Sequence, residues 1–502
     1  MTNLPVANTQ DMPIAGLKPA RVLVLNPPSI DAENLLRDVI YGCWCKGKRI
    51  GGARTPPHPL VQLSTVMRDD GNEVVLMDAM AQHLSVADVQ NAARGFDAVI
   101  IMTSVMTFEE DAAVIAELKK VHPRLISIFC GAMTTFMPEL TLQNDNVDVI
   151  VRREPEFIIR DVLREIRKDE SYHSVLGIGY RDHDGQPVVN DYYPFIKDLD
   201  RIPIPDWSLL PGGGDYFNPA VKRFPYVTDL TTRGCPAKCT FCMSPGFYGN
   251  KVRKRSAKNV LEGFRRYKAR GMKEVYLRDE LFTTFRKRNQ EICETMIAEN
   301  MDLTWLCSSR VDTVDEEMLH LMRKAGCHTI KFGVESGVQE ILDRVKKGIE
   351  LDQVRETFAR CKSVGMRTHA HMMIGHPGET EATIKQTLKF VREIEPTTVT
   401  FGLLTPYPGT SLFDDLMDRF PELEQGFSLN VKDLHIRNGL TDKICDLTAQ
   451  ELSDWVKKAH RDFYWRPKYI AGWLRRVESV SELKKVAKAG AKILDFSVRG
   501  DD

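Results

Sequence analysis

Short apolar runs alternate with helix-like segments along most of this chain of 502 residues, and this alternation constrains the fold more than any other feature. In the N-terminal part the apolar runs occupy 21–28, 72–78, 97–104, 125–131 and 147–154. Because parallel strands need a long crossover connection, usually a helix, the pattern predicts an α/β fold with a Rossmann-like, doubly wound parallel sheet over 21–168. Such sheets bind ligands at the carboxyl ends of their strands.

A second alternation begins at residue 226. Its apolar runs occupy 226–232, 273–279, 303–309, 329–335, 368–374 and 398–404. Six strand–helix units of this length predict a partial (β/α)6 barrel of the TIM type over 226–415. The remaining segments are predicted to be a flexible tail (1–20), a connector (169–225) with an Asp-Gly hairpin turn, and a mainly helical C-terminal region (416–502).

Composition excludes several classes of protein. Lys plus Arg and Asp plus Glu are equal at 69 each, so the overall charge does not favour a nucleic-acid partner. No apolar run reaches the roughly 18–20 residues that span a bilayer, and the N-terminus lacks the features of a signal peptide. We therefore expect a cytoplasmic protein. In that reducing compartment, most of the 11 cysteines are expected to be free thiols or metal ligands.

Three cysteines stand close together in TTRGCPAKCTFCMSP: Cys235, Cys239 and Cys242. Structural zinc sites usually have four protein ligands, and no second cysteine pair or spaced histidine stands near this segment. A [4Fe–4S] cluster has four iron corners, so three cysteines leave one iron open. The motif follows the first barrel strand, at the face where barrel enzymes place their active sites. The pattern predicts a catalytic [4Fe–4S] cluster.

The C-x3-C-x2-C spacing, with the aromatic Phe241 before the last cysteine, resembles the signature of the radical S-adenosylmethionine (radical SAM) superfamily. The resemblance covers about 226–415. It implies that SAM chelates the open iron and that one electron from the cluster cleaves SAM to methionine and a 5′-deoxyadenosyl radical. It also implies an electron donor of the flavodoxin or ferredoxin type.

The later strand ends carry further residues that match the family's SAM contacts in order. The resemblance assigns Phe241 and Gly375 to adenine, Asp279 or Glu280 to the SAM amino group, Arg310 to its carboxylate, and Glu335 and Ser336 to its ribose. The family often has Gly-Gly-Glu where this chain has LRDEL, so the amino-group assignment rests on a departure from the pattern. The alternative for Arg310 and Glu335 is a structural ion pair that braces the barrel.

The N-terminal sheet resembles the cobalamin-binding domain found upstream of many radical SAM enzymes. The resemblance rests on NPP after the first strand, SVMTF, GAMTT and RREPE, and it assigns cobalamin contacts to Ser104, Thr107, Gly131, Thr134 and Glu154. Relatives often have Gly where Arg153 stands. No Asp-x-His-x-x-Gly motif is present, which predicts that no protein imidazole ligates the cobalt. The alternative is a Rossmann-like domain that has lost the cofactor or only shapes the active site.

Three further features leave alternatives open. Cys43 and Cys45 lie in a basic, Gly-rich loop (41–52) that is either local structure or a contact to an anionic group. His369, His371 and His376 are either proton donors and acceptors or packed core residues. The segment YWRPKYIAGWLRR (464–476) suits peripheral docking on a membrane or a lipid-like substrate, or packing of a helix on the barrel mouth.

These observations predict a radical SAM enzyme, most directly a cobalamin-dependent C-methyltransferase acting on an unactivated carbon of a lipid, tetrapyrrole or secondary metabolite. The alternative within the same architecture is a radical cyclase or oxidoreductase without methyl transfer. The cluster motif and the Pro-rich connector also resemble the branch of the anaerobic magnesium-protoporphyrin ester cyclases and hopanoid-associated enzymes. A non-catalytic cluster or corrinoid carrier is disfavoured by the open iron, and tRNA modification by the neutral charge.

Overall fold

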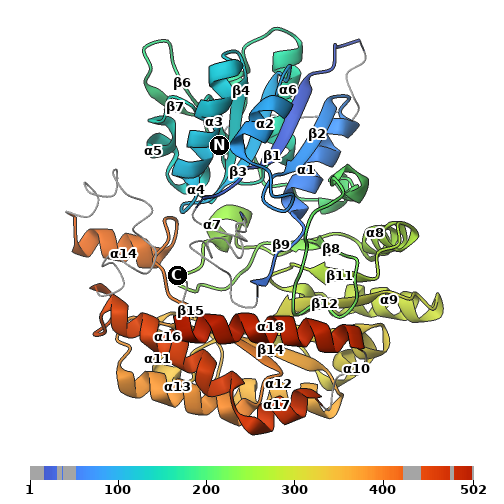
Figure 1. Cartoon of the computed structure of the whole chain (residues 1–502), viewed down its shortest axis with the longest axis vertical. Coiled ribbons are helices and arrows are strands. Elements are labelled where there is room, and N and C mark those ends of the chain that lie inside the picture. Colours follow the sequence, from blue (N-terminus) through green and yellow to red (C-terminus); the bar gives the residue numbers. More distant parts are fainter. Residues whose placement is uncertain (1–15, 31–36, 38–51, 422–442, 475–479, 500–502) are drawn as a thin grey trace, which may run out of the picture.

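The computed structural model describes residues 16–30, 37, 52–421, 443–474 and 480–499. The chain forms two α/β domains, with the N-terminal sheet at the top and the second sheet below it (Figure 1). This arrangement confirms the predicted fold class. Among the described residues, no helix combines the length and the apolar character needed to cross a membrane.

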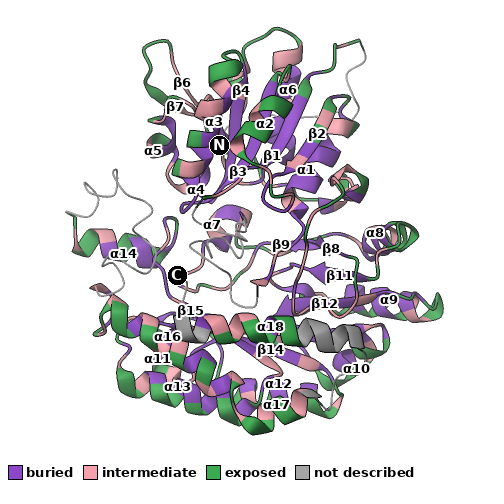
Figure 2. Cartoon of the chain, in the orientation of Figure 1, coloured by how far each residue is buried: buried purple, intermediate pink, exposed green. Residues whose placement is uncertain are grey.

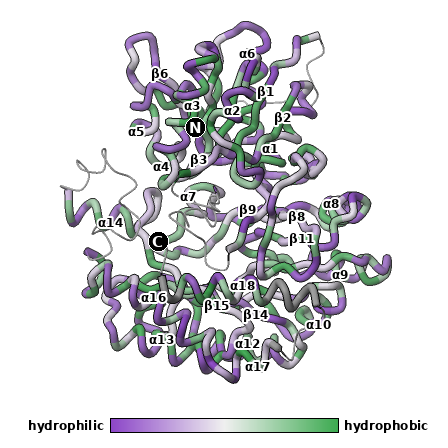
Figure 3. The backbone as a smooth tube through the Cα atoms, in the orientation of Figure 1, coloured by the Kyte–Doolittle hydropathy of each residue, from purple (hydrophilic) through white to green (hydrophobic). Residues whose placement is uncertain are grey.

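The N-terminal sheet has seven strands in the order β2-β1-β3-β4-β5-β6-β7. Its strands are β1 (Arg21–Asn26), β2 (Glu73–Asp78), β3 (Ala98–Thr103), β4 (Ile126–Gly131), β5 (Val149–Val151), β6 (Ile178–Arg181) and β7 (Pro187–Val189). Its helices are α1 (His58–Asp69), α2 (Val86–Ala92), α3 (Phe108–Val121), α4 (Ala132–Phe136), α5 (Pro138–Leu142) and α6 (Pro155–Arg167). The central strand β3, AVIIMT, is apolar up to its last residue and buried at every position, as expected for a strand covered on both faces (Figures 2 and 3).

The predicted connector contributes to this sheet. The Asp-Gly hairpin forms as predicted, but its strands β6 and β7 add two antiparallel strands next to β5. The rest of the connector holds only short 3-10 turns, η2 (Tyr172–Ser174), η3 (Leu199–Arg201) and η4 (Trp207–Leu209).

The second sheet is a six-stranded parallel half-barrel in the order β15-β14-β13-β12-β11-β8. Its strands are β8 (Tyr226–Asp229), β11 (Glu274–Leu277), β12 (Thr304–Ser309), β13 (Cys327–Glu335), β14 (Arg367–Ile374) and β15 (Thr398–Leu403), and β9 (Thr232–Arg233) pairs separately with β10 (Arg253–Lys254). The outer helices are α8 (Ala257–Ala269), α9 (Arg286–Ala298), α10 (Glu316–Lys324), α11 (Gln339–Arg344), α12 (Leu351–Ser363) and α13 (Glu381–Ile394), with short turns η5 (Phe282–Thr284) and η6 (Val311–Thr313).

The C-terminal region is helical, as predicted, with α14 (Ser411–Arg419), α16 (Ala449–Tyr464), α17 (Pro467–Leu474) and α18 (Val480–Arg499). Helix α16 covers the open edge of β15. The backbone N–H of Val399 donates to Tyr464 Oη over 3.0 Å, and that of Phe401 donates to His460 Nε2 over 3.3 Å. Side chains of α16 thus satisfy donors that an exposed edge strand would offer to another chain.

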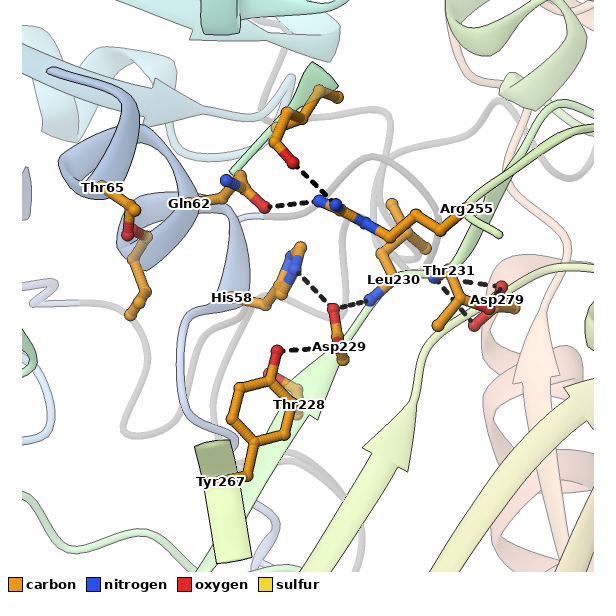
Figure 4. Close-up of polar contacts among 12 residues, drawn as sticks. His58, Gln62, Thr65, Thr228, Asp229, Leu230, Thr231, Arg255, Tyr267 and Asp279 are labelled. Atoms are coloured by element: carbon orange, nitrogen blue, oxygen red, sulfur yellow. Dashed lines mark hydrogen bonds and ion pairs between the residues drawn. The ribbon is translucent and has the colours of Figure 1, made fainter. Parts of the chain in front are cut away.

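Helix α1 joins the N-terminal domain to the first barrel strands (Figure 4). His58 Nε2 lies 3.3 Å from the Asp229 carboxylate, which also accepts a 2.8 Å hydrogen bond from Tyr267 Oη. One turn along α1, Gln62 Oε1 accepts a 3.1 Å hydrogen bond from Arg255. Because these side chains are buried, the network fixes how the two domains meet.

A second contact brings the carboxyl edges of the two sheets together. Phe136 ends α4, directly after β4, and its ring lies against Gly246 and Gly409 of the barrel domain. Gly246 belongs to α7 (Ser244–Tyr248), which follows the cysteine loop, and Gly409 follows β15. A methyl group on Gly246 would come within 2.9 Å of the ring, and one on Gly409 would overlap it. In Figure 1, α7 accordingly lies between α4 and the barrel strands.

Candidate active site

The cysteine loop begins directly after β9 and ends at α7. Gly234 has φ +93°, and a side chain there would collide with the backbone carbonyl of Lys251, so only glycine fits at this bend. The backbone N–H of Cys242 donates to the carbonyl of Cys239 over 3.2 Å, which closes a tight turn between the two thiols. The loop therefore gathers its three cysteines at the carboxyl end of the barrel.

The environment of these thiols disfavours their charged form unless a metal is bound. Burial, the largest cause, raises the pKa of Cys235 to about 11 and raises the pKa values of Cys239 and Cys242 as well. The negative charge of Glu280 adds to the shift at Cys235 and Cys242. Thiolates are the form that binds soft metals, so a metal centre bound here would have to displace the thiol protons.

The number of cysteines fits a cluster better than a structural zinc ion. Structural zinc sites usually take four protein ligands. A [4Fe–4S] cluster has four iron corners, and the loop supplies a cysteine for three of them.

The two carboxylates of LRDEL, Asp279 and Glu280, lie in different surroundings after the end of β11. Asp279 is fully buried, and its carboxylate accepts hydrogen bonds from the backbone and the hydroxyl of Thr231, the latter over 2.8 Å. It therefore braces the end of β8 and is not available to the SAM amino group. Glu280, by contrast, lies close enough to Cys235 and Cys242 to raise the pKa of both thiols.

Arg310 is held as a rigid guanidinium beside the cysteine loop. Its Nη2 donates to Asp312 over 2.9 Å and to the carbonyl of Gly348 over 2.7 Å, and its Nη1 donates to the carbonyl of Lys347 over 3.0 Å. The thiol groups of Cys235 and Cys239 are among the charges that raise the pKa of Arg310, although burial opposes them. The side chain is thus fixed close to the thiols of Cys235 and Cys239.

The ion pair of Glu335 involves Lys347 rather than Arg310. Lys347 Nζ donates to Glu335 Oε1 over 2.7 Å, and both side chains are 9% exposed. Burial lowers the pKa of Lys347, but the negative charges of Glu335 and Cys239 outweigh burial and raise it. Sequence reasoning missed Lys347 because it lies in a loop after α11, away from any strand end, and no motif marks it.

The remaining predicted SAM residues meet around the ends of β13 and β14. The Phe241 ring packs edge-on against His376, with centroids 6.4 Å apart, and His376 Nε2 lies 3.5 Å from the carbonyl oxygen of Glu335. Ser336 is buried and contacts Thr387 through its hydroxyl at 3.3 Å. Gly375, at φ +97°, donates its N–H to Glu379 over 2.6 Å.

The predicted cobalamin residues line the carboxyl edge of the N-terminal sheet. Ser104 and Thr107 share a hydrogen bond of 3.1 Å, and Thr107 donates to Asp111 over 2.8 Å. Thr134 donates to the carbonyl of Val151 over 2.7 Å. At Gly131, φ is +124° and a side chain would collide with the carbonyl of Thr103. The three hydroxyl side chains are buried and bonded within the domain, and Gly131 lets two strand ends approach closely.

Glu154 has a different role from the predicted cobalamin contact. Its Oε1 accepts from Arg233 over 3.0 Å, and its Oε2 accepts from Arg253 over 2.7 Å and from the backbone N–H of Ile196 over 2.9 Å. Arg233, two residues before the first cluster cysteine, also pairs with Glu156. The carboxylates of Glu154 and Glu156 therefore hold β9, the strand that leads into the cysteine loop.

Cys43 and Cys45 lie outside the described residues, as do residues 41–51 of their basic loop. Arg153 replaces the family glycine at φ +67°, a conformation that favours glycine, and its guanidinium lies 3.5 Å from the centroid of the Tyr192 ring.

Comparisons with known proteins bear directly on this site. The family model described as "Radical SAM superfamily" matches residues 230–391, and the one described as "B12 binding domain" matches residues 51–163. An uncharacterized methyltransferase from Pyrococcus horikoshii is 30% identical over 428 residues, covering 84% of this chain and 91% of the relative. The chain belongs to the radical SAM superfamily. The predicted family and enzyme class are thereby confirmed, with [4Fe–4S], SAM and cobalamin as the cofactors.

Other members of the superfamily agree. An anaerobic magnesium-protoporphyrin IX monomethyl ester cyclase from Rubrivivax gelatinosus is 29% identical over 436 residues, covering 84% of this chain and 76% of the relative. The solved structure of the cobalamin-dependent S-adenosylmethionine radical enzyme OxsB, with aqua-cobalamin and S-adenosylmethionine bound, has a TM-score of 0.67 at 18% identity. It covers 95% of this chain and 71% of that structure, and it supports the fold.

Proposed function

We propose that this radical SAM enzyme is a cobalamin-dependent methyltransferase that alkylates an unactivated carbon of a substrate held between its two sheets. One observation carries the proposal: Phe136 packs against Gly246 and Gly409, so the carboxyl edge of the B12-binding domain faces the carboxyl edge of the barrel. Both edges are where sheets of these kinds bind their ligands. A substrate between them is reached from both sides.

In this scheme the bound cofactors supply a 5′-deoxyadenosyl radical from the cluster side and a transferable methyl group from the cobalamin side. Cys235, Cys239 and Cys242 hold the cluster. Glu280 accepts hydrogen bonds from the SAM amino group, and the guanidinium of Arg310 neutralises the SAM carboxylate. The protein orients both cofactors and excludes water, while the cofactors carry the chemistry.

The other SAM contacts are assigned from their position around the strand ends. We place Glu335, with Lys347 and Ser336, at the ribose, and Phe241 and Gly375 at the adenine. Ser104, Thr107, Gly131 and Thr134 line the proposed cobalamin site in the upper domain, through the small side chains that allow close approach there.

A radical cyclase or oxidoreductase is the second candidate. The relative from Rubrivivax gelatinosus, which is 29% identical over most of this chain, is named as a cyclase and not as a methyltransferase. The two reactions share the cluster and the SAM contacts, and they differ in whether a methyl group leaves SAM.

Several partners belong to the same proposal. A small-molecule substrate and a flavodoxin- or ferredoxin-type electron donor follow from the chemistry. We also propose a cytoplasmic location. A lipid-like substrate or a peripheral membrane contact would use the exposed apolar side chains of the 464–476 segment. Trp465 is 43% exposed and Ile470 is 49% exposed. Tyr469 packs against the core and accepts a hydrogen bond from Trp473, which is half-buried.

The test uses the cluster-reconstituted chain without oxygen, loaded with cobalamin, SAM and a strong reductant. We expect both 5′-deoxyadenosine and S-adenosylhomocysteine among the products, because one SAM is cleaved and another gives up its methyl group. Cys235→Ala should abolish 5′-deoxyadenosine, whereas Cys361→Ala, which alters a buried cysteine on α12, should not. 5′-Deoxyadenosine without S-adenosylhomocysteine would favour the cyclase, and neither product from an intact cluster would overturn both candidates.

A further inference from the structure

A group of polar side chains lies inside the half-barrel, below the SAM site. It consists of Tyr276 on β11, Lys331 on β13, His369 and His371 on β14, and Thr400 on β15; we call it the lumen cluster. Lys331 Nζ donates to Tyr276 Oη over 2.7 Å. Strand β12 stands between β11 and β13 in the sheet, so two side chains can meet across it only on the concave face.

The histidines join the same face from the neighbouring strands. Lys331 is paired in register with His369, and His371 with Thr400. Thr400 Oγ1 lies 3.2 Å from His369 Nε2 and 3.1 Å from His371 Nδ1, and the two imidazole rings stand 4.4 Å apart. Hydrogen bonds and ring contacts therefore form two groups along one wall of the lumen. One group is Lys331 with Tyr276, and the other is Thr400 with His369 and His371.

The lumen cluster carries positive charge on lysine alone. Burial, followed by the charges of Lys331 and Lys347, lowers the pKa of His371 well below its ordinary value. Burial and the neighbouring His371 and Lys331 do the same to the pKa of His369. Both imidazoles are therefore neutral, and His371 lies within the field of two ammonium groups, those of Lys331 and Lys347.

The lumen is more open than the outer face of the same strands. Lys331 and His371 keep part of their surface accessible, whereas the alternate residues Ile330, Phe332 and Ala370 are fully buried against the helices. In closed barrels the interior is filled by layers of branched apolar side chains. Here a small apolar cluster, Tyr226, Leu306 and Val221, packs beside the Tyr276 ring.

We propose that the lumen cluster binds an oxyanion of the substrate, a carboxylate or a phosphoryl or phosphonyl group, with Lys331 as the charged anchor. A lysine in low dielectric attracts an anion far more strongly than one in water. Tyr276 accepts a hydrogen bond from Lys331, so its hydroxyl lies directly beside the charged anchor. The inference rests on the proposed function, and it makes the substrate an anion.

The geometry also separates the anchored end of the substrate from its reacting end. Gly333 lies between Lys331 and Glu335 on β13, and a side chain there would collide with Glu335 Oε1 and come within 2.8 Å of Lys347 Nζ. The side chains of Glu335 and Lys347 thus occupy the space over Gly333, between the lumen cluster and the SAM contacts. An anion held at Lys331 would place the rest of the substrate next to this pair.

The test measures binding of two small probes to the full chain: inorganic phosphate, by broadening of its ³¹P signal, and acetate, by broadening of its ¹³C carboxylate signal. Lys331→Gln should weaken binding of the preferred probe at least tenfold, because it removes the positive charge and keeps a polar side chain. Tyr276→Phe removes only a hydroxyl and should weaken it two- to fivefold. Lys258→Gln, an exposed lysine on α8, is the matched control and should change nothing.

Stronger binding of phosphate supports a phosphoryl or phosphonyl substrate, and stronger binding of acetate supports a carboxylate substrate. No binding of either probe, or equal binding by wild type and both lumen variants, overturns the proposal. Wild-type formation of 5′-deoxyadenosine is measured separately. Its loss would overturn the proposed function and leave the probe-binding result standing, so the two failures are distinguishable.

Discussion

At the scale of single residues, neighbouring side chains at one strand end have different tasks. Glu280 raises the pKa values of Cys235 and Cys242, whereas Asp279 accepts hydrogen bonds from Thr231. Both residues lie just after β11, which ends at Leu277, and the chain there turns them toward different neighbours. Two adjacent carboxylates, indistinguishable by type, thus contribute to ligand binding and to architecture respectively.

Glu280→Gln is expected to weaken SAM binding roughly tenfold to a hundredfold, since a hydrogen bond to a charged group contributes about 1.5–3 kcal/mol. Asp279→Asn is the matched control: it should lower the melting temperature, because the buried carboxylate loses part of its hydrogen bonding, with little effect on SAM affinity. Equilibrium binding of SAM and thermal unfolding, both without oxygen, check the pair. Equal losses of SAM affinity in the two variants would contradict the assignment.

Glu379 gives the fold a pH dependence of unusual sign. Its side chain is fully buried, and burial raises its pKa from 4.5 to about 7, although the N–H groups of Gly375 and His376 oppose the shift. Between these two pH values the folded chain holds a proton that the unfolded chain has released. Stability therefore falls as pH rises from about 4.5 to 7, by up to about 3 kcal/mol from this group.

Glu379→Gln should remove this dependence, because glutamine stays neutral and keeps an oxygen for the two N–H donors. We expect the variant to gain stability relative to wild type on going from pH 5 to pH 8, as measured by chemical denaturation at each pH. Glu381→Gln changes an exposed carboxylate two residues away and should show no such trend. A difference between wild type and Glu379→Gln that is constant with pH would contradict the assignment.

At the scale of elements, close approach of the backbone depends on glycines at defined positions. Gly409 and Gly271 have almost the same backbone conformation, φ +85° and +83°, but a side chain at Gly409 would overlap Phe136, whereas nothing lies within 4 Å of one at Gly271. The pair therefore separates the cost of the left-handed conformation from the cost of crowding the interface between the domains.

Gly409→Ala is expected to lose about 1–3 kcal/mol more of the free energy of unfolding than Gly271→Ala, which pays only the conformational cost. Phe136→Ala in the Gly409→Ala background should recover most of the difference, because it removes the ring that the new methyl group meets. Denaturant unfolding of the four proteins checks this. Equal losses for the two glycine variants would show that Phe136 does not hold the elements together.

Much of this arrangement could be predicted from sequence at the element level. Strand–helix alternation and the cysteine spacing predict both sheets and the cluster loop, since they depend on local pattern. The partners of Glu154 and Glu335 could not be predicted. Arg233 lies 79 residues from Glu154, and Lys347 lies in an unmarked loop. Such pairs depend on how separate elements pack, and no local periodicity encodes that.

At the scale of the whole molecule, the two cofactor sites are mechanically joined. The N-terminal domain contacts the barrel through α1, through the carboxylates of Glu154 and Glu156, and through Phe136. The last two contacts flank the cysteine loop, one before its first cysteine and one after its last. Ligand binding in the N-terminal domain is therefore expected to affect the cysteine loop of the barrel domain.

Cobalamin binding should slow hydrogen exchange in residues 132–137 of its own domain and also in residues 243–249 of the barrel, because Phe136 packs α4 against α7. In Phe136→Ala the slowing should persist at 132–137 and be lost at 243–249, since the small side chain no longer reaches Gly246. Hydrogen–deuterium exchange with and without cobalamin, on the cluster-loaded chain, measures both segments at once. Slowing at 243–249 that survives the substitution would mean that the buried carboxylates on Arg233, and not the aromatic contact, carry the coupling between the domains.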